Sequence, residues 1–389
     1  MDVTGLTETM KMLLLYDYPA MPGGLATQGE LLHRGLVELG VDTCAVHFES
    51  DKEKEWYYQW FRPDVVLGVG YWGYTPGIIL HPQRYGLLPV PWLVADGYIA
   101  NYLDVLNNLP LILVTSNWVK KVYSRDGLDH GKVEVLPVGC DTTAFVDRGR
   151  DDPRVAAMRE AVGVKPDEIM IATVGGDATS KGAQEVMQAL AMIDKKVPPW
   201  KYVCKVWDQP RTLQQNMIDL QLAASLGIDK KVVYTTGRFS RNIMPYLLAA
   251  CDIYAAPSRL EGFGMPQVEA NACCKPVIGI KAMAMLDTLV HGKTAFLASI
   301  AQEVRLKECV LHEDEDGGSH RCVSFKRLRT ADYRASVGDI AKYLLKLMND
   351  PELRRKMGEA GRQRVTDMFD YRVVTRQFLN IIKDRLGID

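Results

Sequence analysis

The feature that most constrains the fold is a strand–loop–helix unit at residues 253–277. Residues 253–256 form a short apolar run of the kind found in buried strands. A loop with two glycines follows, and Pro266 is placed to open a helix, where its missing N–H group removes no hydrogen bond. Such a unit directs unpaired N–H groups and the positive end of a helix dipole at one point. The unit therefore predicts an anion site, suited to phosphate, at the end of a strand.

Two carboxylates flank this predicted anion site. Glu261 lies in the loop, and Glu269 is expected in the first turn of the helix. Carboxylates are unsuited to phosphate but accept hydrogen bonds from sugar hydroxyls. A phosphate site beside such acceptors suggests a sugar nucleotide as the ligand. The alternative is an ordinary strand–turn–helix unit whose glycines serve only packing.

Apolar runs and helical periodicity extend this α/β pattern along the chain. The expected strands are 12–15, 43–48, 64–69, 91–95, 111–115, 133–138, 168–174, 202–206, 232–235 and 253–256. The expected helices are 26–39, 154–162, one from 183, 245–250, 337–348, 351–365 and 370–386. Glycine loops follow the strands at 12–15 and 168–174, as in parallel nucleotide-binding sheets. The order of elements predicts two parallel α/β domains, each with a ligand loop at a strand's carboxyl end.

Composition narrows the class of protein. The chain has 389 residues, enough for two domains, with 47% hydrophobic and 24% charged residues, which is typical of soluble globular proteins. A net charge of -1 gives no reason to expect a nucleic-acid partner. Eight scattered cysteines fit a reducing compartment, so we expect a cytoplasmic protein. No signal peptide or membrane span is recognisable, which leaves peripheral membrane contact as the only kind expected.

Residues 257–278 resemble the Glu-x7-Glu motif of retaining glycosyltransferases of family 4. The matching residues read Pro-Ser-x-x-Glu-Gly-Phe-Gly-x-Pro, followed by Glu-Ala-x-Ala-Cys-x-Lys-Pro-Val-Ile. The resemblance implies the GT-B fold, in which two Rossmann-like parallel-sheet domains face each other across a cleft. It also implies a C-terminal helix that crosses back to the first domain. The domains implied are 1–150 for the acceptor, 151–369 for the nucleotide sugar and 370–389 for that helix.

The resemblance also implies roles for residues of the first domain. A Gly-Gly loop, here Gly23 and Gly24, would reach over the donor diphosphate and the transferred sugar. The alternative for these glycines is a turn that requires positive φ. Family members often have a histidine facing the sugar where Asp96 stands here. Asp96 is therefore either an acceptor-binding or sugar-binding residue or an Asx-turn residue before Gly97.

In the second domain, the resemblance implies a donor site built from three loops. Lys181 matches the family lysine that contacts the diphosphate, but the arginine usual before it is absent, and Gly175-Gly176 occupies its place. Arg238 lies in the loop that the family places beside the nucleobase and would face the base or a phosphate. The alternatives are a surface lysine in a turn for Lys181 and a solvated surface group for Arg238. The motif adds six further positions: Glu261 for the transferred hexose, Glu269 for the ribose, and Gly262, Phe263, Gly264 and Met265 at the helix tip.

One segment, about residues 305–332, departs from the family and is expected to be a surface insertion or hairpin. It contains Asp314-Glu315-Asp316, which we interpret as a solvated acidic turn and not as a metal site. No metal or other cofactor is expected. The cysteine pair Cys273-Cys274 is expected to be packed and reduced.

The reaction implied is transfer of a hexose, with retention, from a UDP- or GDP-sugar to an unidentified hydroxyl acceptor. Two alternatives remain open. One is a sugar phosphorylase of related architecture, which would use inorganic phosphate in place of a nucleotide leaving group. The other is a non-catalytic nucleotide-binding subunit. The missing arginine before Lys181 and the missing histidine at the position of Asp96 favour this alternative.

Overall fold

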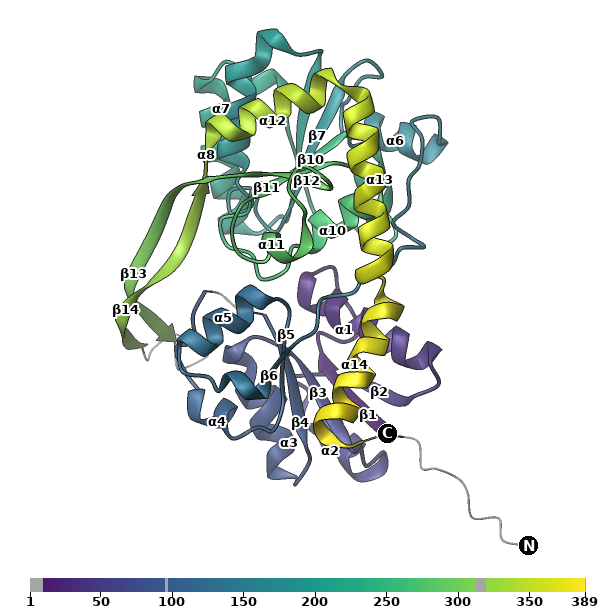
Figure 1. Cartoon of the computed structure of the whole chain (residues 1–389), viewed down its shortest axis with the longest axis vertical. Coiled ribbons are helices and arrows are strands. Elements are labelled where there is room, and N and C mark those ends of the chain that lie inside the picture. Colours follow the sequence, from purple (N-terminus) through teal and green to yellow (C-terminus); the bar gives the residue numbers. More distant parts are fainter. Residues whose placement is uncertain (1–9, 95–96, 313–319, 389) are drawn as a thin grey trace, which may run out of the picture. The chain divides into compact units, whose positions relative to one another are not determined.

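Two six-stranded parallel sheets form the framework of the chain in this computed structural model, which describes residues 10–94, 97–312 and 320–388. The described residues divide into two units by their contacts. Unit 1 holds those of 1–139 and 371–389, and unit 2 holds those of 140–370. Each unit contains one of the sheets, with helices packed on it (Figure 1). The predicted α/β class with two parallel sheets is confirmed.

The sheet of unit 1 has the strand order β2-β1-β3-β4-β5-β6, and all neighbours run parallel. Its strands are β1 Lys11–Tyr16, β2 Asp42–His47, β3 Val65–Gly70, β4 Pro89–Leu93, β5 Ile112–Val114 and β6 Val133–Val135. Every residue of β3, β4 and β5 is buried, which explains why these strands read as continuous apolar runs and not as alternating ones.

The helices of unit 1 include the last helix of the chain. They are α1 Gly24–Glu38, α2 Asp51–Trp60, α3 His81–Arg84, α4 Leu103–Asn107, α5 Asn117–Arg125 and α14 Tyr371–Leu386. Helix α14 packs directly on α1, since a Cβ atom at Gly35 would lie 2.0 Å from Oγ1 of Thr375. Nε of Arg372 also lies 2.9 Å from Oε2 of Glu38. The C-terminal helix therefore belongs to the first unit, although the whole of unit 2 separates it from α5 in sequence.

The sheet of unit 2 has the order β12-β11-β10-β7-β8-β9 and is also parallel. Its strands are β7 Ile169–Val174, β8 Trp200–Val206, β9 Val232–Thr236, β10 Ile253–Ala255, β11 Val277–Ile280 and β12 Ala295–Ala298. Its helices are α6 Pro153–Ala161, α7 Ala183–Ile193, α8 Pro210–Ser225, α9 Met244–Ala250, α10 Met265–Ala272, α11 Met285–Thr288, α12 Val337–Asn349 and α13 Pro351–Met368.

Unit 2 begins at Cys140, whereas the resemblance implied a domain boundary after residue 150. The backbone N–H of Cys140 donates to the carbonyl of Phe369 at 2.7 Å. Nη2 of Arg362 donates to the carbonyl of Thr142 at 3.0 Å. These bonds fix the residues after Gly139 to helix α13 and the end of unit 2.

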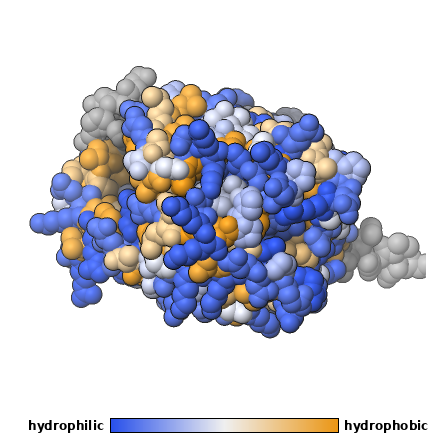
Figure 2. All heavy atoms as spheres, turned by 90° about the horizontal axis from the view of Figure 1, so that it is seen from above, coloured by the Kyte–Doolittle hydropathy of each residue, from blue (hydrophilic) through white to orange (hydrophobic). Residues whose placement is uncertain are grey.

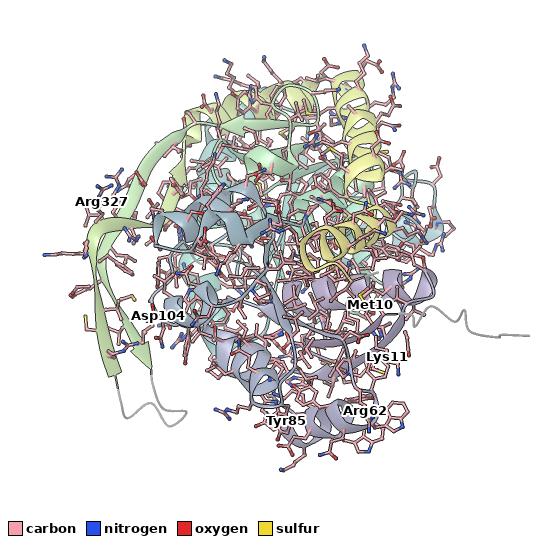
Figure 3. All side chains as sticks on the ribbon, turned by 60° about the horizontal axis from the view of Figure 1, so that its bottom comes forward. Met10, Lys11, Arg62, Tyr85, Asp104 and Arg327 are labelled. Atoms are coloured by element: carbon pink, nitrogen blue, oxygen red, sulfur yellow. The ribbon has the colours of Figure 1, made fainter. Side chains whose placement is uncertain are left out.

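The segment that departs from the family is a long antiparallel hairpin of β13 Ile300–His312 and β14 His320–Ala335. It starts and ends several residues outside the predicted limits of 305–332. Its base is closed by a 2.8 Å hydrogen bond from the Ser336 N–H to the Ser299 carbonyl. Farther along, Arg327 projects from β14 away from the ribbon (Figure 3). The acidic turn 314–316 lies outside the described residues.

The surface carries few large apolar areas on the face drawn in Figure 2. That face is mostly hydrophilic, with hydrophobic residues in small scattered groups. Scattered apolar residues of this kind are normal on folded proteins and need no functional explanation.

Candidate active site

The strand order of unit 2 brings two distant loops to one place. From β7 the chain moves through α7 and β8 toward β9, whereas from β10 it moves the opposite way to β11 and β12. Because β7 and β10 are neighbours, the loops that leave their carboxyl ends diverge from a topological switch point. Open α/β sheets bind their ligands there. Lys181 follows β7 and Glu261 follows β10, so both predicted residues lie at this point.

The N-terminus of α10 follows the second loop and depends on Gly264. Gly264 is the N-cap residue and has a φ of 92°, a backbone conformation that residues other than glycine rarely adopt. A Cβ atom there would also lie 2.3 Å from Cε of Met285. Because glycine offers no side-chain oxygen, the first N–H groups of the helix remain directed at whatever lies in front of them. Helix α10 therefore starts with an N-terminus that has no side-chain cap.

Lys181 and Glu261 contact each other directly. Nζ of Lys181 lies 2.6 Å from Oε2 of Glu261, although the two residues are 80 positions apart. Their side chains are only 20% and 14% exposed, which strengthens their interaction relative to a surface pair. The loops that carry them are joined by a 2.8 Å hydrogen bond from the Arg259 N–H to the Ser180 carbonyl. A cation, a carboxylate and a helix tip are thus held together.

Glu269 is buried in α10 and paired with Arg241, a residue that the sequence analysis did not identify. Oε1 of Glu269 lies 2.8 Å from Nη1 of Arg241. Burial raises the pKa of Glu269, and the guanidinium of Arg241 opposes this shift. Because α10 begins at Met265, Glu269 is its fifth residue, so the prediction that it falls in the first turn is wrong. A buried carboxylate needs a nearby cation or hydrogen-bond donors, so a search of the sequence for a cation to pair with Glu269 could have pointed to Arg241.

The remaining predicted residues of unit 2 divide into backbone and surface groups. Phe263 is buried, and its ring meets the ring of Phe369 edge-on with centroids 5.8 Å apart. Only the backbone of Phe263 is therefore available to a ligand, as it is for Gly262, whereas half-buried Met265 opens α10. Arg238 is exposed in the loop after β9 and forms no hydrogen bond or ion pair with the described residues.

The remaining predicted site residues belong to unit 1. Gly24 begins α1, and Gly23 is its N-cap residue with φ of 175°. That value is extended backbone that any residue adopts, so positive φ does not explain Gly23. A Cβ atom there would have no neighbour closer than 3.9 Å. Asp96 lies outside the described residues.

The site in unit 2 can stabilise a diphosphate and grip hydroxyl groups. Lys181 and the tip of α10 supply positive charge, and Glu261 and Glu269 supply acceptors. Within residues 10–94, 97–312 and 320–388, no group of three or more His, Cys, Asp or Glu side chains is arranged to hold a metal ion. Cys273 is buried and is not in a disulfide, as expected for a packing residue.

A family model described as glycosyl transferases group 1 matches residues 155–310. A curated relative, the MMP alpha-(1->4)-mannosyltransferase of Mycolicibacterium hassiacum, is 24% identical over 293 residues, which is 75% of this chain and 58% of the relative. The D-inositol 3-phosphate glycosyltransferase of Mycobacterium tuberculosis is 30% identical over 189 residues, which is 49% of this chain and 37% of the relative. The chain therefore spans little more than half, or less, of these relatives' length.

Solved structures resemble the chain over nearly its whole length. Sucrose-phosphate synthase from Thermosynechococcus elongatus has a TM-score of 0.75 at 16% identity, covering 98% of this chain and 100% of its own. Anabaena Alr3699/HepE in complex with UDP and glucose has a TM-score of 0.73 at 16% identity, covering 97% and 100%. At such low identity these likenesses establish the fold alone.

Among the described residues, no helix is both long and apolar enough to cross a bilayer. The family match covers Lys181 and Glu261, which contact each other at the switch point of unit 2, and it also covers Glu269 of α10. Residues 155–310 match the model of the group 1 glycosyl transferases, and the chain has the GT-B fold of two parallel α/β units.

Proposed function

We propose that this protein transfers a hexose from a nucleotide diphosphate sugar to a hydroxyl acceptor, with retention of the anomeric configuration. The observation that carries the proposal is the meeting of Lys181, Glu261 and the tip of α10 at one point. When the bond between the sugar and the diphosphate breaks, negative charge grows on the leaving diphosphate. A cation and a helix N-terminus already aimed at that charge stabilise the transition state more than the ground state.

Each carboxylate has a separate role in this proposal. Glu261, held against Lys181, accepts hydrogen bonds from the transferred hexose and orients it toward the acceptor. Glu269 accepts hydrogen bonds from the ribose hydroxyls, and the guanidinium of Arg241 opposes the rise in its pKa that burial causes. We assign no covalent intermediate to either residue and no metal to the reaction.

The donor is best sought first among uridine nucleotides. The neighbouring structures of Anabaena Alr3699/HepE hold UDP or UDP-glucose, which supports a UDP-sugar as the donor here. The mannosyltransferase and inositol-phosphate glycosyltransferase names of the relatives support a hexose as the transferred group. We keep GDP-sugars in the same test, since the residues of the site do not discriminate between the bases.

A thermal-shift screen of the whole protein tests donor binding. UDP, GDP and ADP, and the corresponding glucose and mannose nucleotides, are added separately with and without EDTA. A nucleotide present at about 100 times its Kd stabilises the folded chain by about 2.7 kcal/mol. We expect one base to give this shift, and we expect EDTA to leave it unchanged. The absence of a shift with every nucleotide would refute the proposal.

Variants and product analysis then test the chemistry. Glu269→Ala is expected to weaken donor binding, since it removes the ribose acceptor. Once an acceptor supports turnover, the product's anomeric configuration is measured by NMR and is expected to match that of the donor. A product of inverted configuration would refute retention but not the donor site.

A further inference from the structure

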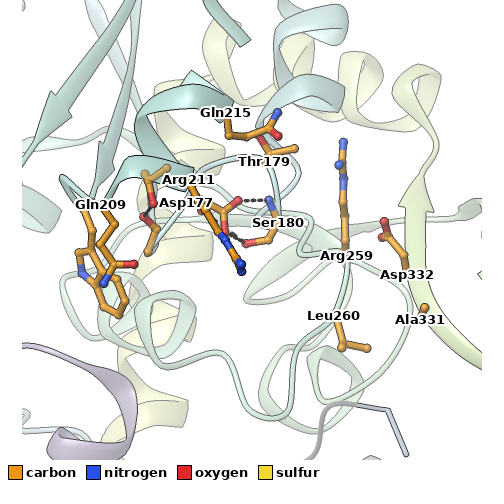
Figure 4. Close-up of a pocket in the computed structure, with 13 residues that line it drawn as sticks. Asp177, Thr179, Ser180, Gln209, Arg211, Gln215, Arg259, Leu260, Ala331 and Asp332 are labelled. Atoms are coloured by element: carbon orange, nitrogen blue, oxygen red, sulfur yellow. Dashed lines mark hydrogen bonds between the residues drawn. The ribbon is translucent and has the colours of Figure 1, made fainter. Parts of the chain in front are cut away.

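A second pocket lies next to the candidate active site in unit 2, with a volume of about 540 Å³. Four segments line it: residues 176–180 after β7, residues 207–215 at the start of α8, the pair Arg259-Leu260, and the pair Ala331-Asp332 on β14 (Figure 4). Lys181, Glu261 and Glu269 do not line it. Its volume is in the range of small-molecule sites, and the proposed donor chemistry leaves it unused.

One end of the pocket is electropositive. Helix α8 has 16 residues, starts at Pro210 and receives no side-chain cap from Gln209, so its first turn presents unpaired N–H groups. Arg211 stands in that turn, is exposed, and forms no ion pair or hydrogen bond with the part of the chain that the structure describes. Its side chain extends into the space bordered by Gln209 and Ser180 (Figure 4). A helix tip and a guanidinium together form a strong phosphate-binding arrangement.

The opposite wall contains two buried polar atoms without partners. Arg259 is 8% exposed, and although its Nη2 donates to both carboxylate oxygens of Glu185 at 3.0 Å, its Nε has no hydrogen-bond partner among the described residues. Oδ1 of Asp332 is likewise buried and unpartnered, while its Oδ2 lies 2.8 Å from Nη2 of Arg334. Figure 4 shows Arg259 and Asp332 beside each other, across the pocket from Gln209.

A donor and an acceptor left unsatisfied inside a protein are costly, and a ligand that pairs with both removes that cost. A sugar hydroxyl both donates and accepts, so it suits Arg259 Nε and Asp332 Oδ1. Trp207 adds an apolar wall, since its ring packs against Gly176, where a Cβ atom would lie 3.2 Å from the ring. The pocket thus offers a phosphate-binding end, a hydroxyl-binding wall and a ring surface.

We propose that this pocket binds a phosphorylated sugar or polyol, distinct from the donor nucleotide, with the phosphate at Arg211 and the tip of α8 and the hydroxyls at Arg259 and Asp332. The hairpin contributes Asp332, so the segment absent from the family pattern completes the site. Ser180 and Arg259, which are joined by a backbone hydrogen bond, line this pocket, whereas Lys181 and Glu261 do not. The inference does not depend on the proposed glycosyl transfer.

Isothermal titration calorimetry of the whole protein with hexose 6-phosphates tests the proposal, with glucose and inorganic phosphate as partial probes. We expect one hexose phosphate to bind per chain, and each partial probe to bind more weakly. Arg211→Gln, an exposed change that leaves folding intact, is expected to raise the Kd at least about tenfold, since a charged hydrogen bond is lost. Arg355→Gln, an exposed change on α13, is the charge-matched control and is expected to leave the Kd unchanged.

Nucleotide binding separates this site from the proposed active site. Arg211→Gln is expected to keep UDP or GDP affinity, and Lys181→Ala is expected to keep hexose phosphate affinity while losing nucleotide affinity. Hexose phosphate binding that survives Arg211→Gln, or that is lost with Lys181→Ala, would overturn the proposal, as would the absence of binding at millimolar concentration. If nucleotides fail to bind but the Arg211 result holds, the donor proposal fails and the second pocket stands.

Discussion

Replacing Arg241 by methionine tests how the buried carboxylate of Glu269 is maintained. Glu269 is 4% exposed, and its nearest cation is Arg241 at 2.8 Å. Methionine preserves much of the arginine's apolar stem but removes the charge. The variant therefore leaves a carboxylate inside the protein whose ionised form has lost its main compensation.

The magnitude follows from the geometry of the pair. Two unit charges about 4 Å apart attract by about 4 kcal/mol at an effective dielectric constant of about 20. Removing one partner of a fully buried pair costs about 3–5 kcal/mol. The side chain of Arg241 is 32% exposed, and water therefore screens part of the attraction. We expect Arg241→Met to lower the free energy of unfolding by about 2–3 kcal/mol near neutral pH.

The raised pKa of Glu269 determines whether the stability lost in Arg241→Met grows or shrinks with pH. The folded-state pKa of Glu269 is raised above its ordinary value, chiefly by desolvation. In the window between the unfolded and folded pKa values, the folded state binds more protons than the unfolded state, so stability falls as pH rises. Without Arg241 the folded pKa rises further, and the loss of stability grows with pH. Urea unfolding of Arg241→Met and wild type near pH 5 and near pH 8 measures this difference.

The double variant Arg241→Met/Glu269→Gln is the control, because a neutral amide requires no cation. We expect it to recover most of the stability that Arg241→Met loses near pH 8. An Arg241→Met variant equally destabilised at both pH values would refute the reasoning, since it would show that packing and not charge was lost. A double variant no more stable than the single one would lead to the same conclusion.

Three further changes address other parts of unit 2. Lys181→Ala is expected to lower turnover more than about tenfold, and normal kinetics would exclude the lysine from the site. Gly264→Ala is expected to reduce nucleotide affinity, because a side chain at φ of 92° strains the backbone at the tip of α10, whereas Gly292→Ala places the same kind of strain in a different loop and is the control in the binding assay. Asp219→Ala is expected to lower the free energy of unfolding by about 3 kcal/mol or more, because several buried donors lose their acceptor; a loss below about 1 kcal/mol would show that they find others.

Much of the fold was predictable because its strands are buried on both faces. Runs such as β3 and β7 are buried throughout, almost entirely apolar, and bounded by glycine or charged residues, so they are recognisable without an alternating pattern. The start of α10 was predictable from Pro266, and the cap of α5 from Ser116, whose Oγ accepts from the Val119 N–H at 3.2 Å. Local chemistry at these positions agrees with the tertiary structure.

Helix α8 was not predicted because its buried face is mainly polar and its exposed face carries large apolar residues, the reverse of the usual pattern. Its buried residues are mainly polar, namely Thr212, Asn216 and Asp219 with Ala223, whereas Leu213 and Met217 are 44% and 64% exposed. Hydrophobic periodicity therefore points to the wrong face. The buried polar face is explained by tertiary contacts, since Oδ2 of Asp219 accepts hydrogen bonds of 2.7 Å from Thr179 Oγ1 and Tyr234 OH. Sequence spacing holds no record of such partners.

The same limit applies to the candidate site. The motif identifies Lys181, Glu261 and Glu269, but their pairing depends on the adjacency of β7 and β10 and on a loop before α9. Arg241 and the pocket beside α8 are products of that arrangement. The sequence therefore identifies the residues that belong to a motif. It does not identify residues such as Arg241, whose role depends on which residues lie beside them in the folded chain.

The hairpin has a practical consequence for anyone who shortens the chain to aid crystallisation. The N–H of Tyr333 on β14 donates a 2.8 Å hydrogen bond to the carbonyl of Arg259, two residues before Glu261. A deletion of both strands, from Ile300 to Ala335, would remove the Tyr333 N–H. The Arg259 carbonyl, in the loop that carries Glu261, would then lose this hydrogen bond. A shortened protein should therefore keep residues 331–335 and remove only the distal part of the hairpin. Otherwise the loop that carries Glu261 is held less firmly, and the donor affinity measured is not that of the intact protein.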